Sequence, residues 1–233
     1  MKFISPLITG TLIKRYKRFL ADITLDNGEE ITAHCANPGA MTGLAAPGSK
    51  VWLSQSTNPK RKLKYSWELV EADGTLVGIN TAHPNKIVVE AIKADAIAEL
   101  VGYHTLKTEQ RYGKNSRIDI LLEDSSKPLC YVEIKNVHLM RKSGLAEFPD
   151  SVTARGAKHL DELAEMVKQG NRAVMVYLIQ RTDANNFTLA KDVDPHYATR
   201  FAAARTAGVE AIAYACALSE TEIKLTEKIE LLD

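Results

Sequence analysis

Three charged residues interrupt two apolar stretches in the segment 117–136, which reads RIDILLEDSSKPLCYVEIKN. Asp119 lies between two isoleucines, and Glu133 and Lys135 alternate with valine and isoleucine. Two carboxylates that approach each other repel unless a cation or a proton lies between them. Mg²⁺ or Mn²⁺ prefers such oxygen ligands, and a neighbouring lysine stabilises charge or orients water. This combination of residue types is typical of phosphodiester hydrolysis.

Strand geometry predicts that these side chains meet. Side chains alternate between the two faces of a strand, so Glu133 and Lys135 project from the same side. In the preceding stretch Ile118, Ile120 and Leu122 are expected on one face, with Arg117 and Asp119 on the other. The turn DSSK at 124–127 makes the two strands hairpin neighbours. Opposed side chains in a hairpin are about 5 Å apart, so the register can bring Asp119 to the other two.

The tripeptide EIK is weak evidence by itself, because it is also what an exposed, alternating strand looks like. The chain contains a second copy at Glu222–Lys224 without an acidic partner pattern before it. Only the first copy follows an apolar strand with a central aspartate and precedes a helix. That context, and not the tripeptide, favours a site.

The composition is that of a globular protein with a substantial core. Hydrophobic residues make up 45% and charged residues 25% of 233 positions, and the net charge of +1 gives no general attraction to nucleic acid. Cys35, Cys130 and Cys216 are far apart among apolar neighbours, which predicts reduced core thiols. No stretch approaches the roughly 20 apolar residues of a membrane span. We therefore expect a soluble, cytoplasmic protein that does not bind membranes.

The two parts of the chain differ in pattern and charge. Residues 1–80 carry ten Lys and Arg against seven Asp and Glu, and they contain about five short strands separated by turns such as DNG at 26–28. This predicts a small barrel of the oligonucleotide-binding (OB) type over 1–80. Residues 81–233 predict the order α-β-β-β-α-β-α-β, a mixed α/β (α+β) domain. Its first helix is expected to start with Asn85 as N-cap and to stop at Gly102, and its second to be capped by Asp150 or Ser151.

Five segments resemble the signatures of the sugar fermentation stimulation protein family, and the resemblance spans nearly the whole chain. They are NPGAMTG at 37–43, NTAHPN at 80–85, GKNSRID at 113–119, VEIKN at 132–136 and FPDSVTARGAKHL at 148–160. The resemblance implies an OB-like barrel followed by a restriction-endonuclease-like domain of the PD-(D/E)xK type. In that pattern Asp119 matches the first acid, Glu133 the second and Lys135 the lysine. The chain departs from it at Ile118, where the pattern has proline.

Further candidates surround this site. Arg155 and His159 are spaced i, i+4 on the second helix, with Glu162 continuing their face, and the first two are predicted to contact a phosphate or orient metal-bound water. A polar helix face explains the same spacing. Glu90 is a candidate further metal ligand beside Asp119 and Glu133, and Glu109 is a similar one, although an exposed glutamate is the commoner explanation.

Two basic runs predict a DNA-binding surface on the barrel, because cations that follow a backbone and aromatics that stack on bases are typical of sequence-tolerant binding. Solubilising turns have the same composition. Tyr16 lies within the first run and Phe19 follows it, whereas Tyr65 and Trp67 follow the second run. The predicted DNA-binding residues are Lys14, Arg15, Lys17, Arg18, Lys60, Arg61, Lys62 and Lys64. The segment 33–43, with His34 and Cys35, stays unassigned.

Three functions are compatible with the sequence. The first is non-specific DNA binding with Mg²⁺- or Mn²⁺-dependent DNA cleavage, and the family resemblance adds a regulatory part in maltose metabolism. The second is a catalytically inactive DNA-binding transcriptional regulator that keeps the nuclease fold as a scaffold. The third, a carbohydrate-binding module, draws only on the barrel and the family's connection with sugar. DNA is the expected partner, no small-molecule cofactor is evident, and the sequence does not define the oligomeric state.

Overall fold

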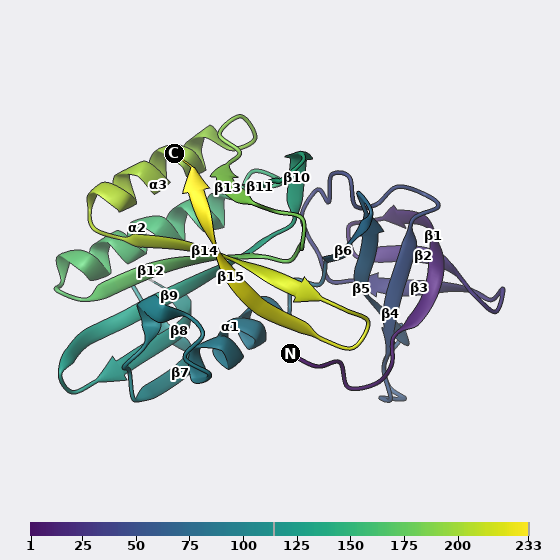
Figure 1. Ribbon diagram of the computed structural model, residues 1–233, viewed down its shortest axis with the longest axis horizontal. Coiled ribbons are helices and arrows are strands. Elements are labelled where there is room, and N and C mark those ends of the chain that lie inside the picture. The colour runs from purple at the N-terminus through teal and green to yellow at the C-terminus, as the bar shows by residue number, and fades with distance from the viewer. Residues whose placement is uncertain (114, 233) are drawn as a thin grey trace.

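The computed structural model describes residues 1–113 and 115–232, so Lys114 of the GKNSRID segment and Asp233 lie outside the described residues. Two sheets organise the chain, one of six strands and one of nine (Figure 1). The six-stranded sheet is built from the N-terminal part, and the nine-stranded sheet carries all three α-helices. The predicted combination of a small barrel and a mixed α/β domain is confirmed.

The first sheet closes into a barrel. Its strands follow the order β3-β2-β1-β4-β5-β6, and an additional parallel pairing of β3 with β5 joins His34 to Ser66 and Cys35 to Trp67. Its interior is apolar because alternate residues point inward; Ala21, Ile23 and Leu25 of β2 are buried. The strands are β1 (Ile8–Tyr16), β2 (Leu20–Leu25), β3 (Glu30–Cys35), β4 (Lys50–Gln55), β5 (Tyr65–Ala72) and β6 (Thr75–Gly78).

The second sheet has the order β10-β11-β13-β15-β14-β12-β9-β8-β7. It is mixed: β7, β8 and β9 form an antiparallel meander, whereas β9, β12 and β14 run parallel. Its strands are β7 (Thr105–Tyr112), β8 (Ser116–Asp124), β9 (Lys127–Val137), β10 (Leu139–Lys142), β11 (Leu145–Phe148), β12 (Arg172–Ile179), β13 (Asn186–Leu189), β14 (Glu210–Leu218) and β15 (Ile223–Leu232).

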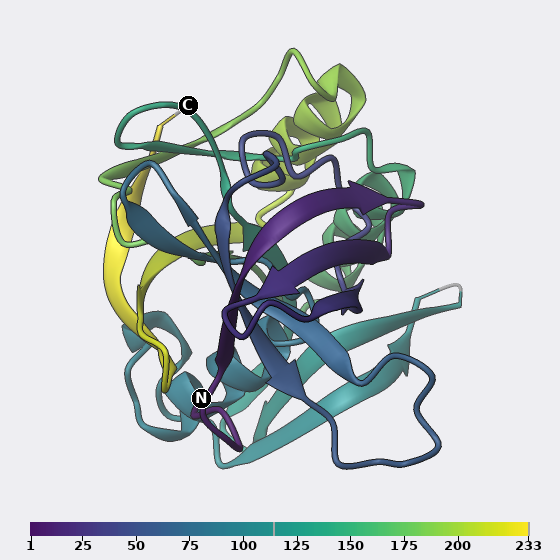
Figure 2. The ribbon, with the colours of Figure 1, turned by 90° about the vertical axis from the view of Figure 1, so that its right-hand side faces the viewer.

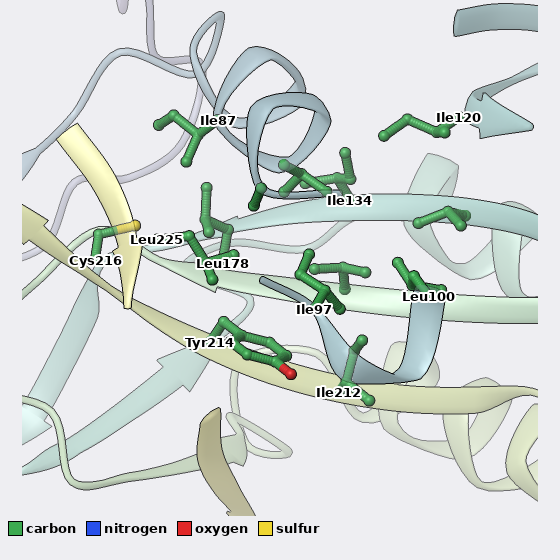
Figure 3. Packing of buried hydrophobic residues seen from close by; sticks show 14 of the residues in the cluster. Ile87, Ile97, Leu100, Ile120, Ile134, Leu178, Ile212, Tyr214, Cys216 and Leu225 are labelled. Atoms are coloured by element: carbon green, nitrogen blue, oxygen red, sulfur yellow. The ribbon is translucent and has the colours of Figure 1, made fainter. Parts of the chain in front are cut away.

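Helices cover both faces of this sheet. The helix α1 (Pro84–Lys93) lies on one face, and α2 (Ala154–Lys168) and α3 (Pro195–Thr206) lie together on the other (Figure 1). The core between the sheet and α1 gathers side chains from α1, β8, β9, β12 and β14, with the 3-10 turn Ala98–Leu100 at its edge (Figure 3). The strand β12 contributes to both cores, because Val174, Val176 and Leu178 face α1 while Ala173, Met175 and Tyr177 face α2 and α3. This double burial explains its apolar sequence.

Several boundaries differ from the sequence prediction. The first helix ends at Lys93 and not at Gly102, and its N-cap is His83, so Asn85 lies inside the first turn. The second helix is capped by Thr153, whose hydroxyl accepts a hydrogen bond from the Gly156 N–H, and not by Asp150 or Ser151. The short strands β10, β11 and β13 escape a periodicity analysis because four residues hardly define a period.

The three cysteines are free and buried, as predicted. The second EIK segment leads into β15, and Glu222 forms an isolated bridge with Lys2 just before that strand. Of the helices within residues 1–113 and 115–232, none combines the length and the apolar character that a membrane crossing requires.

The two sheets are joined by buried polar contacts. The guanidinium of Arg181, which is 1% exposed, donates to Asp73 in the β5–β6 turn and to Asp183. Because an unpaired buried charge costs several kcal/mol, these contacts hold the barrel against the sheet in one arrangement.

Asp194 provides a stability test of the α2–α3 layer. One carboxylate oxygen accepts the Tyr197 N–H at 2.9 Å as the N-cap of α3, and the other accepts the Thr153 N–H at 2.7 Å. Asp194→Ala removes the acceptor of the buried Tyr197 N–H and of the partly buried Thr153 N–H, so we expect a loss of about 2–3 kcal/mol in the free energy of unfolding by urea. Asp194→Asn keeps the cap acceptor and should lose less. Equal midpoints for Asp194→Ala and the wild type would contradict this role.

Candidate active site

A cleft of about 1200 Å³ lies between the barrel and the nine-stranded sheet. Its walls come from β1 and the β1–β2 turn, the segments 37–40 and 81–85, Glu109 of β7, the strands β8 and β9 with the adjoining His138, and the region from Phe148 to His159. All three residues of the predicted constellation, Asp119, Glu133 and Lys135, line it, and so do Arg155 and His159. The structure therefore brings together residues that are up to about 145 positions apart.

The β8–β9 hairpin positions the two acids. Its register pairs Ile120 with Val132, and the next positions along this register are Asp119 and Glu133. There the ladder changes, because Oδ2 of Asp119 accepts the Ile134 N–H at 2.7 Å. The expected alternation also breaks: Ile120 packs in the core under α1, whereas Ile118 packs in the core under α2 and α3. Asp119 thus stands at an irregular point of the strand, with its carboxylate fixed by the backbone of β9.

Asn85 holds the other oxygen of Asp119. Its side-chain amide donates to Oδ1 of Asp119 at 2.9 Å and lies 3.4 Å from Oε1 of Glu109. The prediction that Asn85 caps the helix is wrong, because Pro84 and Asn85 already belong to the first turn of α1. The signal for its true role was its polar side chain at the helix start within NTAHPN, but sequence alone did not show that α1 begins beside β8.

Glu133 is the most buried acid of the site, with 2% of its surface exposed. Its Oε1 accepts the Lys135 ammonium at 2.6 Å and is also hydrogen-bonded to Nδ1 of His159. Within the described residues, its Oε2 has no hydrogen-bond partner. A buried carboxylate oxygen without a donor is costly, so this atom requires a partner from outside the chain, such as water or a cation.

The two acids have opposite electrostatic environments. Burial raises the pKa of Asp119, and the charge of Glu133 raises it further against the hydrogen bonds from Ile134 and Asn85. Burial also acts to raise the pKa of Glu133, but Lys135 and His159 outweigh it and hold that pKa below its usual value. Asp119 is therefore the acid whose charged form is disfavoured in this cleft, and a cation between the two carboxylates would relieve the repulsion from Glu133.

His159 contacts the acid rather than open solvent. Nε of Arg155 donates to Nε2 of His159 at 3.4 Å, which leaves Nδ1 of the ring to donate to Glu133. His159 is buried, and its hydrogen bond to Oε1 holds the Glu133 side chain in place. Glu162, expected to continue their face, is not among the residues that line the cleft; it lies 3.6 Å from the Lys158 ammonium.

The two other glutamates have different positions. Oε2 of Glu90 lies 2.7 Å from the N-terminal ammonium, and Glu90 does not line the cleft, so its prediction as a metal ligand is not supported by its position. Glu109 does line the cleft, and its φ of 54° sets it at an irregular point of β7 beside Asn85. No group of three or more His, Cys, Asp or Glu side chains arranged to hold a metal is found in residues 1–113 and 115–232.

The first basic run reaches the cleft, but its members differ. Arg15 and Arg18 line the cleft, whereas the ammonium of Lys14 lies 3.6 Å from Asp22 on the barrel surface. The guanidinium of Arg15 donates to four backbone carbonyls, so Arg15 fixes the β1–β2 turn to the segment 37–40. These acceptors are the carbonyls of Asn37 at 2.8 Å, Gly39 at 2.9 Å, Arg18 at 3.1 Å and Ala40 at 3.3 Å.

The second basic run lies outside the cleft. Lys60, Lys62 and Lys64 belong to the β4–β5 connection, and Arg61 donates to the Ser66 hydroxyl at 2.6 Å. Trp67, which was expected to offer a stacking surface, is fully buried and donates its indole N–H to the Leu69 carbonyl. The second run is therefore positively charged, but the tryptophan that follows it is not exposed for stacking.

Residues 37–40 of the unassigned segment 33–43 line the cleft on its barrel side. Oδ2 of Asp150 accepts the Met41 N–H at 3.1 Å and lies 3.3 Å from Nε2 of His138. A Cβ atom on Gly39 would come within 2.3 Å of the same oxygen, so only glycine permits this approach. The segments NPGAMTG and FPD therefore interlock across the junction of the two sheets.

Comparison with known proteins adds the family context. The sequence model "Sugar fermentation stimulation protein RE domain" matches residues 82–222, and "SfsA N-terminal OB domain" matches residues 13–79. A sugar fermentation stimulation protein homolog of Rhodospirillum centenum is 59% identical over 99% of this chain and 99% of its own length. One of Paramagnetospirillum magneticum is 58% identical over 97% of this chain and 95% of its own.

A solved structure agrees over the full length. The structure of Pyrococcus furiosus SfsA in complex with Ca²⁺ has a TM-score of 0.90 and 27% sequence identity, and the match covers 100% of this chain and 98% of that one. The OB barrel and the mixed-sheet, restriction-endonuclease-like domain predicted from the sequence are therefore both confirmed.

The contacts of Asp150 predict that acid destabilises the junction between the two sheets. Burial would raise its pKa, but the hydrogen bond and charge of His138, with the Met41 N–H, hold it at about 2. Because the folded pKa is depressed, the stabilisation is present above about pH 4 and is lost as the pH falls toward 2, by about 2 kcal/mol in total. Urea unfolding across this range should give a shallower slope for Asp150→Asn. Parallel curves for the two proteins would contradict the assignment.

Arg15 is predicted to act through the fold. Arg15→Ala leaves four carbonyl oxygens without their donor, so we expect a loss of about 2 kcal/mol in the free energy of unfolding. Lys17→Ala, a neighbouring change that also removes one positive charge, is the matched control and should stay within about 0.5 kcal/mol of the wild type. If both variants unfold at the same urea concentration, the hydrogen bonds of Arg15 do not contribute to the free energy of unfolding.

Proposed function

Because this chain belongs to the sugar fermentation stimulation protein family, we propose that it binds DNA without strong sequence preference and hydrolyses its phosphodiester bonds with a divalent metal ion. The observation that carries this proposal is the meeting of Asp119, Glu133 and Lys135 in one cleft, with Oε2 of Glu133 buried and lacking a partner among the described residues. A regulatory part in maltose metabolism stays a prediction from the family resemblance.

The donor set fits Mg²⁺ or Mn²⁺. Asp119 and Glu133 would hold the ion, because both present carboxylate oxygens to the cleft and the repulsion between them calls for a positive charge. The related Pyrococcus furiosus protein was solved in complex with Ca²⁺, a cation that also prefers oxygen ligands. When bound, such an ion supplies Lewis-acid polarisation of a phosphate and a more acidic water.

The side chains around the acids have separate roles in this proposal. His159 and Lys135 fix Oε1 of Glu133, and Oε2 has no hydrogen-bond partner among the described residues. Asn85 and the Ile134 N–H fix Asp119 in the same way. Lys135, with 13% of its side chain exposed to the cleft, can turn from Glu133 toward a phosphate and stabilise the charge that develops on it. Arg155 supports His159 and adds positive charge at the cleft wall.

A DNA-binding regulator without cleavage activity is the second candidate. Two carboxylates are fewer than many metal centres use, and residues 1–113 and 115–232 contain no cluster of three or more candidate ligand side chains. Such a protein would use the same cleft for phosphates only. The two functions separate in the experiment below.

We expect the purified protein to cleave DNA in Mg²⁺ or Mn²⁺ and to lose this activity in EDTA. Asp119→Asn and Glu133→Gln keep the shape of each side chain but remove its charge, so the rate should fall about a hundredfold or more. The matched control is Glu90→Gln, which removes a carboxylate outside the cleft and should cleave like the wild type. Unchanged cleavage in the first two variants would place the activity elsewhere.

Metal binding without DNA separates the roles of the acids and the lysine. Titration calorimetry with Mn²⁺ should show a site that Glu133→Gln loses and that Glu90→Gln retains. Lys135→Met should still bind Mn²⁺ but should lose cleavage, because the lysine acts on the substrate and not on the ion. DNA binding by the wild type with neither Mn²⁺ binding nor cleavage would favour the regulator.

A further inference from the structure

An outward-facing row of side chains crosses three strands of the barrel next to the cleft. Strand register places Tyr16 of β1 opposite Leu20 of β2, and Leu20 opposite His34 of β3. All three are partly exposed, while the intervening Ala21, Ala33 and Cys35 point into the barrel core. The row is therefore a surface patch of mainly aromatic and apolar groups on the outside of the barrel.

Phe19 extends this row toward the β1–β2 turn. Its ring lies parallel to the His34 ring, with 6.4 Å between centroids and 17° between planes, and 45% of Phe19 is exposed. A large aromatic ring loses favourable burial in such a position, yet its open face offers a surface on which another planar ring can stack. Among the described aromatic residues of the barrel, only Phe19 is exposed; the others are buried or partly exposed.

In the adjoining row, which consists of Lys14, Asp22 and Thr32, the charged side chains contact other side chains of the barrel surface. Asp22 accepts hydrogen bonds from the Tyr16 and Thr32 hydroxyls at 3.0 and 2.8 Å and lies 3.6 Å from the Lys14 ammonium. Its negative charge is thus used within the surface. The charges that remain directed outward at this end of the barrel are those of Lys17 and Arg18 in the turn.

The turn itself keeps two long cationic side chains at a conformational cost. Lys17 and Arg18 have φ angles of 48° and 63°, in the left-handed region that favours glycine. The side chain of Arg15 holds this conformation through the Arg18 carbonyl. Glycine or asparagine would relieve the turn, so the side chains at these positions contribute something other than stability.

The row and the cleft are continuous. Arg18 lies between Tyr16 and Phe19 in the sequence and lines the cleft that contains Asp119 and Glu133. The β1–β2 turn, the β4–β5 connection and the β7–β8 hairpin extend toward the same side when the molecule is seen from the barrel end (Figure 2). In OB folds generally, the strand 2–3 face and the connections after strands 1 and 4 contact oligonucleotides.

We propose that this surface, composed of Phe19, His34, Leu20 and Tyr16, binds the bases of an unpaired DNA strand, and that Arg18 guides its backbone into the cleft. This proposal rests on the proposed function and specifies its substrate class. Stacking on Phe19 and His34 requires exposed faces of the bases, which a continuous duplex keeps stacked on each other. The preferred substrate is therefore single-stranded DNA or an unpaired end.

Phe19→Trp gives a direct readout of stacking that does not depend on cleavage. The two native tryptophans, Trp52 and Trp67, are 3% and 0% exposed, so the new indole would be the accessible one. In EDTA, a single-stranded oligothymidylate should quench its emission, and the wild type should show little change. A duplex of mixed sequence should bind about tenfold or more weakly and should not quench it.

Affinity measurements test the two parts of the surface separately. Phe19→Ala should weaken binding of the oligothymidylate about tenfold with an unchanged salt dependence, because stacking and not charge is lost. Arg18→Gly removes the charge at a position whose backbone favours glycine, so the fold should be at least as stable. Its binding should become less salt-dependent by about one phosphate contact. Ile4→Ala, a change at a fully exposed apolar residue outside the surface, is the control and should bind like the wild type.

The outcomes distinguish this proposal from the nuclease proposal. Equal affinity for duplex and single strand, or quenching of Phe19→Trp by neither, would overturn the single-strand surface while leaving metal-dependent cleavage untouched. Quenching and tenfold loss in Phe19→Ala, without cleavage by the wild type in Mn²⁺, would support the surface and refute the nuclease. Unchanged affinity in Phe19→Ala would also overturn the stacking contact.

Discussion

The structure depends on how a buried carboxylate, Glu133, is stabilised in the middle of a sheet. Removing an acid from water costs several kcal/mol unless charges and donors compensate. Here Lys135 comes from the same strand and His159 from α2, so the sheet and its covering helix must pack in one register for both to reach Oε1. The second oxygen is buried and has no hydrogen-bond partner among the described residues. Stability and function thus meet at a single side chain.

The opposite wall of the cleft is held by a different kind of contact. Arg15 and Asp150 bind backbone groups of the segment 37–41 from two sides, Arg15 from β1 of the barrel and Asp150 from the connection between β11 and α2. Arg181 adds a buried ionic contact at the junction. A polar junction of this kind fixes orientation more than it adds stability. Its result is that the β1–β2 turn and the two acids face the same space, as a strand passing from the barrel to the acids would require.

Sequence patterns predicted those features that depend on neighbours along the chain. The hairpin of β8 and β9 follows from two strand-like stretches joined by a short turn, and its register puts Asp119 near Glu133. The family signatures indicated that Arg155 and His159 belong with them. Contacts made by distant segments were not predictable in this way: Asn85 reaches Asp119 only because α1 starts beside β8, and Arg15 has the same composition as a DNA-binding arginine but uses its donors on carbonyls. Glu90 shows the converse: its position on the helix suited a metal ligand, but its carboxylate contacts the N-terminal ammonium instead.

The central claim is that Asp119 and Glu133 share one divalent cation. Anomalous diffraction from crystals of the protein grown with Mn²⁺ tests it most directly, because manganese gives a signal that carbon, nitrogen and oxygen do not. The account predicts one strong peak between the two carboxylates, within ligand distance of Oε2 of Glu133, with Lys135 free to move away from Oε1. A cleft without manganese, or a peak that is bound elsewhere and leaves both acids unchanged, would contradict it.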